Sequence, residues 1–423
     1  MERSRPLRLF LSAGEPSGDL HGANLVRQLR ERYADLEVVG YGGPQMAAAG
    51  CRLHEDLTAL AVMWFFRVLL NLHRFLGLVS RADRYFRHQK PDAVILIDYP
   101  GFNWWIARRA KAHGIPVFYF APPQIWAWAR WRVKKMRRLV DHVLCGLPFE
   151  AEWFCRHHCN AVLVGHPFFD EVRPAQYDGA FLDQYRCETG PLVTILPGSR
   201  TQEVVGNLEM MLRAAGRIQA AVPDVRFAIA AFKPMHAEMA ADEVSASGLS
   251  VRIHVGKTPE LMRLSDCCMA VSGSVSLELL CQTKPTVILY RIGRVAYLVQ
   301  AIFRKVKYIT LVNLLAAEDP FSDSAADEHP EQAMFPEFLT CTDKSEAIAA
   351  QVIQWLKDPI ALGQRVEQLS RLKATVAQGG AAGRAADYIL HALANEPAKS
   401  PRPHFPVRPA LEPVRNGVSV RNA

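Results

Sequence analysis

The chain has 423 residues, of which half are hydrophobic and 22% are charged. This length exceeds what one ordinary core accommodates and predicts two globular domains of about 150 to 200 residues. The formal net charge of +8 excludes a strongly acidic protein. It indicates an anionic partner, such as a nucleotide, a nucleic acid or a membrane surface, without choosing among them.

The cysteine pattern favours a reducing, cytoplasmic compartment, because the nine cysteines are odd in number and form no spaced framework. The segment CRHHC at residues 155–159 lacks a second ligand pair at zinc-finger spacing, so we expect no metal there. The apolar run before Gly14 is too short for a signal peptide. No stretch of about 20 consecutive apolar residues occurs, so we expect no segment that spans a bilayer.

Short apolar runs, each followed by a turn and a helix-like stretch, form two series along the chain. The predicted strands are 7–13, 37–39, 93–97, 117–120, 143–145 and 162–164 in the first series, and 192–196, 226–230, 251–255, 268–271 and 286–289 in the second. Strands that alternate with helices predict two doubly wound, Rossmann-like α/β domains with parallel sheets. Their ligand should lie in the cleft between them, outside the carboxyl ends of the strands.

We expect residues 1–172 to form the N-terminal α/β domain, which would face the membrane and bind the acceptor, and residues 173–345 to form the second. The polar stretch near 173–178 is the expected joint. Helices at 344–357, 360–378 and 381–394 would follow, and the C-terminal helices of residues 346–394 could pack back on the N-terminal domain or onto a partner chain. The tail 395–423 is rich in Pro and Arg, which predicts disorder.

The stretch LVTILPGSRTQEV at residues 192–204 predicts a strand, a tight turn and the start of a helix. Such a turn directs free backbone N–H groups and the positive end of a helix dipole to one point. Arg200 adds a guanidinium, so the motif suits an anion such as a diphosphate. An ordinary turn between a strand and a helix would have the same pattern.

Three other groups of acidic or small residues stand at predicted strand ends. GEPSGD at 14–19 follows the first strand, and DYPGFN at 98–103 follows the strand at 93–97. SGSVSLE at 272–278 predicts a cradle of small residues for an anion. Glu278 would accept from the two hydroxyls of a ribose, or would complement the dipole of its helix.

Residues 57–81 combine a wide apolar surface with a narrow polar stripe. At about 100° per residue, the side chains of Arg67, Asn71, Arg74 and Arg81 share one side of a helix. Two interpretations fit this pattern: a buried core helix, or an amphipathic helix that lies in a membrane interface.

Residues 126–138, WAWARWRVKKMRR, interleave three tryptophans with six basic side chains and contain no acid. This pattern suits single-stranded nucleic acid or anionic lipid headgroups, and also a solvated basic helix with core tryptophans. The apolar segment 57–81 favours the membrane, because binding to nucleic acid gives no reason to expose Leu and Phe.

Taken together, these motifs resemble the lipid-A-disaccharide synthase family over about residues 7–390. In the family's order they are AGEPSGD (13–19), GGPQM (42–46), IDYPGFN (97–103), PPQIWAW (122–128), LPFE (147–150), GHP (165–167), LPGSR (196–200) with Glu203, SGSVSLE (272–278), YR (290–291) and NLLA (313–316).

The resemblance implies a GT-B glycosyltransferase fold and an inverting, metal-independent reaction without a cofactor. The substrates would be UDP-2,3-diacylglucosamine and 2,3-diacylglucosamine 1-phosphate, and the products the β(1→6) disaccharide and UDP. The chain has no Asp-x-Asp motif, which agrees with a reaction that needs no metal. The acyl chains imply peripheral contact with anionic lipids on the cytoplasmic face of the inner membrane. A homo-oligomer is possible, but no motif reports it.

By the same resemblance, Asp98 is the candidate base that takes the proton from the acceptor hydroxyl, and Glu15 is the alternate. Arg200 would stabilise the leaving UDP. The expected nucleotide and diphosphate contacts are Gly198, Ser199, Arg200, Glu203, Ser272, Gly273, Ser274, Glu278, Arg291 and Asn313. The expected membrane or acyl contacts are Val62, Met63, Trp64, Phe65, Phe66, Leu69, Leu70, Trp126, Trp128 and Arg132.

The sequence departs from the family pattern in three places. Bulky residues 64–67 follow AVM, Val312 precedes Asn313 where Pro is usual, and an acidic segment at 318–335 looks inserted. Two other enzyme classes remain open, a lipid-linked N-acetylglucosaminyl transferase and a UDP-sugar epimerase, although an epimerase does not need the apolar segment 57–81. A basic nucleic-acid-binding protein is the third alternative, and it leaves the strand-end motifs without a role.

Overall fold

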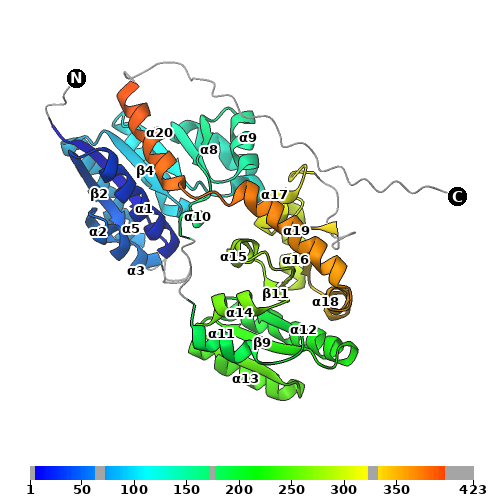
Figure 1. Ribbon diagram of the computed structural model, residues 1–423. Helices are drawn as coiled ribbons and strands as arrows, with labels where there is room; N and C mark the ends of the chain where they lie inside the picture. Colours follow the sequence, from blue (N-terminus) through cyan, green and yellow to red (C-terminus); the bar gives the residue numbers. More distant parts are fainter. Residues whose placement is uncertain (1–4, 62–71, 172–176, 323–331, 396–423) are drawn as a thin grey trace.

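The computed structural model describes residues 5–61, 72–171, 177–322 and 332–395. Within these residues the chain forms two parallel β-sheets of seven and six strands, each covered by helices on both faces (Figure 1). Parallel sheets need apolar side chains on both faces, and the central strands here are buried along their whole length. The predicted fold class, two doubly wound α/β sheets, is confirmed.

The first sheet has the strand order β3-β2-β1-β4-β5-β6-β7. Its strands are β1 (Leu7–Ala13), β2 (Leu36–Gly42), β3 (Arg52–Asp56), β4 (Ala93–Ile97), β5 (Val117–Phe120), β6 (His142–Cys145) and β7 (Ala161–Leu163). The helices around it are α1 (Pro16–Arg32), α2 (Pro44–Ala48), α3 (Thr58–Ala61), α5 (Leu72–Gln89), α6 (Pro100–Ala112), α7 (Ile125–Trp128), the 3-10 turn η1 (Arg130–Arg132), α8 (Val133–Leu139), α9 (Pro148–Arg156) and α10 (Phe168–Glu171).

The second sheet has the order β10-β9-β8-β11-β12-β13. Its strands are β8 (Leu192–Leu196), β9 (Arg226–Ala231), β10 (Val251–Val255), β11 (Cys267–Val271), β12 (Thr286–Arg291) and β13 (Glu337–Thr340). The helices are α11 (Gly179–Arg186), α12 (Thr201–Ala221), α13 (Pro234–Ser247), α14 (Thr258–Leu264), α15 (Val275–Cys281), α16 (Arg294–Phe303) and α17 (Leu311–Ala316).

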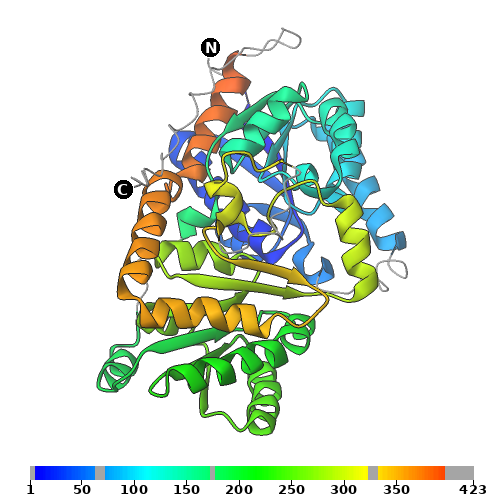
Figure 2. The same ribbon diagram turned by 90° about the vertical axis from the view of Figure 1, so that its right-hand side faces the viewer.

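Three C-terminal helices follow: α18 (Ser345–Lys357), α19 (Pro359–Val376) and α20 (Ala381–Asn395). Helix α18 packs on α12 and α19 contacts α15, both beside the second sheet, whereas α20 packs on α1 beside the first. Both views show α20 next to the blue N-terminal segment (Figures 1 and 2). Arg32 and Asp387 form an ion pair of 2.6 Å across this contact. The proposed domain limits at residues 172 and 345 remain predictions.

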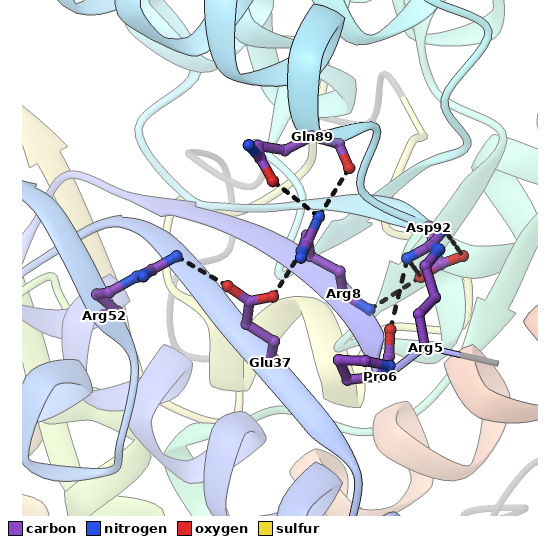
Figure 3. Close-up of polar contacts among 7 residues, drawn as sticks. All are labelled: Arg5, Pro6, Arg8, Glu37, Arg52, Gln89 and Asp92. Atoms are coloured by element: carbon purple, nitrogen blue, oxygen red, sulfur yellow. Dashed lines mark hydrogen bonds and ion pairs between the residues drawn. The ribbon is translucent and has the colours of Figure 1, made fainter. Parts of the chain in front are cut away.

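A polar network closes the amino-terminal edge of the first sheet (Figure 3). The Arg8 guanidinium donates to Glu37 over 2.6 Å and to the carbonyl of Gln89 over 2.9 Å, and Arg52 donates to the other oxygen of Glu37. Asp92 accepts from the Arg8 amide over 2.8 Å. These charges therefore satisfy one another at this edge.

Sequence reasoning missed two edge strands. β3 is polar and partly exposed, with the sequence RLHED, and β13 has only four residues and borders the segment that looked inserted. Edge strands show little of the apolar signal that identified the others. The segment 126–138 is also not one helix, since it divides into α7, η1 and α8.

The segment 57–81 begins in α3 and ends in α5, which continues to Gln89. Residues 62–71 and the tail 396–423 lie outside the described residues, and so do 172–176 at the expected joint. No helix within the described ranges has the length and apolarity that crossing a bilayer requires. Over the same ranges, no group of three or more His, Cys, Asp or Glu side chains could hold a metal ion.

Candidate active site

Asp98 stands where β4 ends, and its backbone is in the left-handed region with φ 51°; Tyr99 follows with φ 43°. Two consecutive non-glycine residues in this region cost on the order of 1–3 kcal/mol each and need support from their surroundings. The main-chain carbonyl of Asp98 accepts hydrogen bonds from Asn103 over 2.7 Å and from the Tyr119 hydroxyl over 2.7 Å. This pair of donors fixes the strained turn and therefore the direction of the carboxyl group.

Asn103 is fully buried and joins the ends of β1 and β4. Its amide nitrogen also lies 3.2 Å from the carbonyls of Ser12 and Ile97, and its oxygen accepts from the Ser12 hydroxyl over 2.6 Å. The last residue of the DYPGFN motif thus has a structural role, which its position in the sequence did not reveal.

The GEPSGD motif packs directly against the DYPGFN motif. A Cβ atom on Gly14 would lie 2.2 Å from the ring of Tyr99, so only glycine fits there. A Cβ atom on Gly18 would lie 3.5 Å from Cβ of Asp98, which is ordinary contact. The two carboxylate-bearing turns that follow β1 and β4 are therefore neighbours, and Glu15 lies exposed at the start of α1.

Asp19, the last residue of GEPSGD, is buried. Its carboxylate accepts from the backbone amides of Gly43, Gln45 and Met46 over 2.8 to 3.0 Å, at the amino terminus of α2. A carboxylate there satisfies the helix's unpaired N–H groups and its dipole. This contact explains why the GGPQM motif accompanies the GEPSGD motif.

Between them, the pKa values of the Asp98 and Glu15 carboxyl groups depend on charges from both halves of the protein. Burial raises the pKa of Asp98, and the Tyr99 amide and the positive charge of His21 partly oppose this. The pKa of Glu15 is raised first by desolvation and then by the negative charge of Asp98, whereas Arg200 lowers it. Because Arg200 follows β8 of the second sheet, a charge from one half of the protein thus acts on a carboxyl of the other.

His21 and Glu171 form a polar pair beside these carboxyls that the sequence did not indicate. Nδ1 of His21 lies 2.7 Å from Oε1 of Glu171. Burial lowers the pKa of the neighbouring His166 to about 4, and the charge of His21 adds to this effect. His21 lies on α1, His166 lies just before α10, and Glu171 ends α10. Their spacing in the sequence does not identify them as neighbours.

The turn after β8 differs from expectation in one respect. Gly198 is left-handed, with φ 118°, but the amides of Ser199 and Arg200 both donate to Oε2 of Glu203, over 3.0 and 3.1 Å. The prediction that these two N–H groups are free for an anion is therefore wrong, because the α12 carboxylate already caps them. The Arg200 side chain, 82% exposed, also lies 3.0 Å from Glu203.

The small-residue turn after β11 remains open, with Gly273 and Ser274 exposed and Ser272 half-buried. Glu278, one turn into α15, is half-buried, and burial raises its pKa. The Arg291 side chain lies 3.4 Å from Glu209 of α12.

Asn313 is buried, and its side chain is fully engaged inside the second half. Its nitrogen donates to the Phe335 carbonyl and to Glu337, and its oxygen accepts from the Phe335 amide. The prediction that Asn313 faces the nucleotide is therefore wrong: this side chain holds the entry to β13.

The predicted membrane contacts divide into three groups. Trp126, the first tryptophan of the PPQIWAW motif, is fully buried in the core, and its indole donates to Glu150 over 2.9 Å. The prediction that Trp126 contacts lipid is therefore wrong. Trp128 is 47% exposed, and the Arg132 guanidinium lies 4.7 Å from its ring centroid. The remaining contacts, Val62, Met63, Trp64, Phe65, Phe66, Leu69 and Leu70, lie outside the described residues.

Comparisons with known proteins show which family the chain resembles. The family model described as lipid-A-disaccharide synthetase matches residues 9–367. The chain is 32% identical over 391 residues to a lipid-A-disaccharide synthase of Myxococcus xanthus, covering 92% of this chain and 98% of the relative. The chain belongs to the lipid-A-disaccharide synthetase family. A relative from Geobacter sulfurreducens is also 32% identical, over 394 residues, with the same coverage of both chains.

As a member of the lipid-A-disaccharide synthetase family, the protein is a glycosyltransferase of lipid A biosynthesis that acts on lipid A precursors. Solved structures support the GT-B fold. A UDP-GlcNAc 2-epimerase from Neisseria meningitidis bound to UDP-GlcNAc has a TM-score of 0.57 at 12% identity and covers 92% of this chain and all of that one. MurG of Acinetobacter baumannii has a TM-score of 0.55 at 14% identity, covering 91% and 99%. At such identities the likeness concerns the fold alone.

Proposed function

We propose that the protein transfers the diacylglucosamine of UDP-2,3-diacylglucosamine to the 6-hydroxyl of 2,3-diacylglucosamine 1-phosphate, with inversion and without a metal. The observation that supports this proposal is that Glu15 of the first half feels both the charge of the neighbouring Asp98 and that of Arg200 from the second half. Acceptor activation needs a carboxylate and nucleotide departure needs a cation; in this proposal the first half supplies the carboxylate and the second half the cation.

Asp98 is the proposed general base. Its raised pKa brings it closer to neutrality than an ordinary aspartate, and a stronger base takes a hydroxyl proton more readily. The strained turn, held by Asn103 and Tyr119, presents this carboxyl in one direction. Glu15 is the alternate base; because it is exposed and feels the charges of both Asp98 and Arg200, we assign it to substrate positioning.

The nucleotide is proposed to bind on the second half. Arg200 would neutralise the charge that develops on the diphosphate as the sugar leaves. The turn Ser272–Ser274 offers small exposed groups for close approach, and Glu278 is placed one helical turn later to accept from a ribose. Since Glu203 caps the amides before α12, a diphosphate at this turn would contact the Arg200 side chain rather than these amides.

Peripheral attachment to the cytoplasmic face of the inner membrane is the final part of the proposal. Trp128 is exposed, and the Arg132 guanidinium lies over its ring, a pairing that suits the headgroup layer of a bilayer. Both substrates are acylated, so an enzyme that stays at the bilayer surface meets them where they reside.

The test is to incubate the purified protein with both acylated sugars in EDTA, and to measure UDP and the disaccharide together. The proposal expects equal amounts of the two products, formed at the same rate when EDTA is replaced by magnesium. UDP release without disaccharide, or a rate that requires the divalent ion, would refute the proposed reaction.

A further inference from the structure

A concave basic pocket of about 850 Å³ lies on the first half of the protein, between α6 and the η1–α8 segment. Gly101, Trp104 and Trp131 line part of it. The cations that line it are Arg108, Arg132, Lys134, Lys135, Arg137 and Arg138. Among the described residues that line it there is no Asp or Glu, so they present one sign of charge over a concave, partly apolar surface.

The cations in this pocket repel one another. The pKa of Lys135 is lowered, first by burial and then by the positive charges of Arg108, Arg132 and Arg138. Its ammonium group lies 5.1 Å from the ring centroid of Trp104, which is a weaker partner than a carboxylate. A bound anion would relieve this repulsion, and a phosphate monoester carries close to two charges and several acceptor oxygens.

The pocket adjoins the segment that carries the proposed base. Gly101 is three residues after Asp98 and belongs to the same DYPGFN motif, in the first turn of α6. A ligand phosphate held here would lie on the acceptor side of the gap, whereas Arg200, the proposed partner of the diphosphate, belongs to the second half.

An apolar ridge borders the same pocket. Helix α16 has no buried residue, and Val295, Leu298 and Ile302, which share one helix face, are 65–76% exposed. At the end of α16, the ring centroid of Phe303 lies 6.2 Å from that of Trp131, which lines the pocket.

Main-chain contacts hold α16 in this place. The Lys305 amide donates to the Ala127 carbonyl over 2.8 Å, and Arg130 donates to the carbonyl of Lys305. Figure 2 shows α16, in yellow, beside the first half of the molecule. A basic pocket next to an exposed apolar ridge suits an amphiphile whose phosphate and acyl chains are close together.

We propose that this pocket binds the phosphate of the acylated acceptor sugar, and that the α16 face receives its acyl chains. The inference rests on the proposed function, because it assigns the acceptor's phosphate to a site separate from the nucleotide. A phospholipid headgroup has the same phosphate chemistry, so the test must separate these two sources.

The test compares the full-length protein with the Lys134→Gln/Arg137→Gln variant. Both side chains are exposed on α8, and their removal should leave the melting temperature unchanged. The variant should raise the KM for the phosphorylated acceptor about tenfold or more, because charge-assisted contacts to phosphate are lost. An acceptor that lacks the phosphate should give the same KM with both proteins, and the KM of the donor should not change.

The matched control is Arg217→Gln/Lys357→Gln, which removes two exposed cations of the second half and should leave the acceptor KM unaltered. The kinetics are run with short-chain acceptors that dissolve as monomers, and sedimentation with anionic vesicles is measured separately. Equal acceptor KM values for parent and variant would overturn the inference. So would a defect that appears only with vesicles, since the pocket would then bind bilayer headgroups.

Binding of the short-chain acceptor is also measured directly by calorimetry, without donor. If the parent released no UDP but bound this acceptor at least tenfold more tightly than the variant, the proposed reaction would fail and the phosphate pocket would stand. If parent and variant bound it equally, the pocket assignment would fail whatever the turnover.

Discussion

The side-chain amide of Asn103 donates to the main-chain carbonyl of Asp98 over 2.7 Å, while its oxygen accepts from the hydroxyl of Ser12. One buried side chain thus ties the end of β1 to the end of β4 and supports a left-handed residue between β4 and α6. Asn103 therefore orients the proposed base, Asp98, without taking part in the reaction itself.

Replacing Asn103 with Ala should lower both stability and turnover. The change leaves buried polar groups of Ser12 and Asp98 without their partner, which costs about 2–3 kcal/mol in the free energy of unfolding. The turn at Asp98 would also lose one of its two supports. Urea denaturation and kcat measure the two effects. The control Asn24→Ala, whose side chain accepts from Arg27 within the same helix, should change neither. An Asn103→Ala enzyme with parental kcat would contradict the positioning role.

The pH dependence of turnover should report the protonation of Asp98. A base works when deprotonated, so kcat/KM should fall as the pH drops through the pKa of Asp98. Because burial raises this pKa, the fall should occur at a higher pH than the ordinary aspartate pKa of about 3.9 would give. The charge of His21 lowers this pKa, so His21→Asn should move the limb to higher pH. A limb that stays fixed, or moves down, would argue against Asp98 as the titrating group.

Glu150 should make the protein less stable as the pH rises. Burial raises its pKa to about 7, although the Trp126 indole and the Gly146 and Leu147 amides favour the charged form. The folded state thus prefers the protonated carboxyl, and stability is lost between the ordinary value of about 4.5 and pH 7, then levels off. Thermal melting from pH 4 to 9 should show this loss in the parent and a flatter profile in Glu150→Gln. Parallel profiles would contradict the assignment.

Arg200→Gln should slow the chemical step on the order of 10² to 10³, because the developing diphosphate charge loses its cation. The acceptor KM should stay within about twofold, as Arg200 is proposed to contact the nucleotide only. Steady-state kinetics with each substrate varied provides the measurement, and Arg217→Gln, on the helix α12 that Arg200 precedes, is the control. A variant that raises the acceptor KM while kcat is unchanged would assign Arg200 to the acceptor instead.

The sequence was sufficient to predict the central strands of both sheets, because these strands are continuous apolar runs followed by Gly, Pro or Asp. It failed at β3 and β13, where edge strands carry polar residues. The motifs identified the turn at Asp98, but they did not reveal why they contain these residues. Asp19 caps α2, and Gly14 leaves room for the ring of Tyr99. Such roles depend on contacts between residues far apart in the chain, which periodicity does not encode.

The same reason explains the three corrections at the site. Glu203 was expected to serve the ligand and instead caps the amides of the turn, while Asn313 and Trp126 were expected at a surface and are buried with polar partners. A polar or aromatic residue inside a motif identifies a family, but only the fold decides whether its side chain faces the ligand or the core.

The central claim, that Asp98 activates the acceptor opposite the nucleotide, is tested most directly by Asp98→Asn. UDP release with both acylated sugars and calorimetric binding of UDP are measured side by side, with Asp183→Asn, an exposed carboxyl of α11, as the control. The account predicts a loss of turnover on the order of 10² to 10⁴ with UDP affinity within about twofold of the parent. Turnover near the parental rate in Asp98→Asn would contradict it.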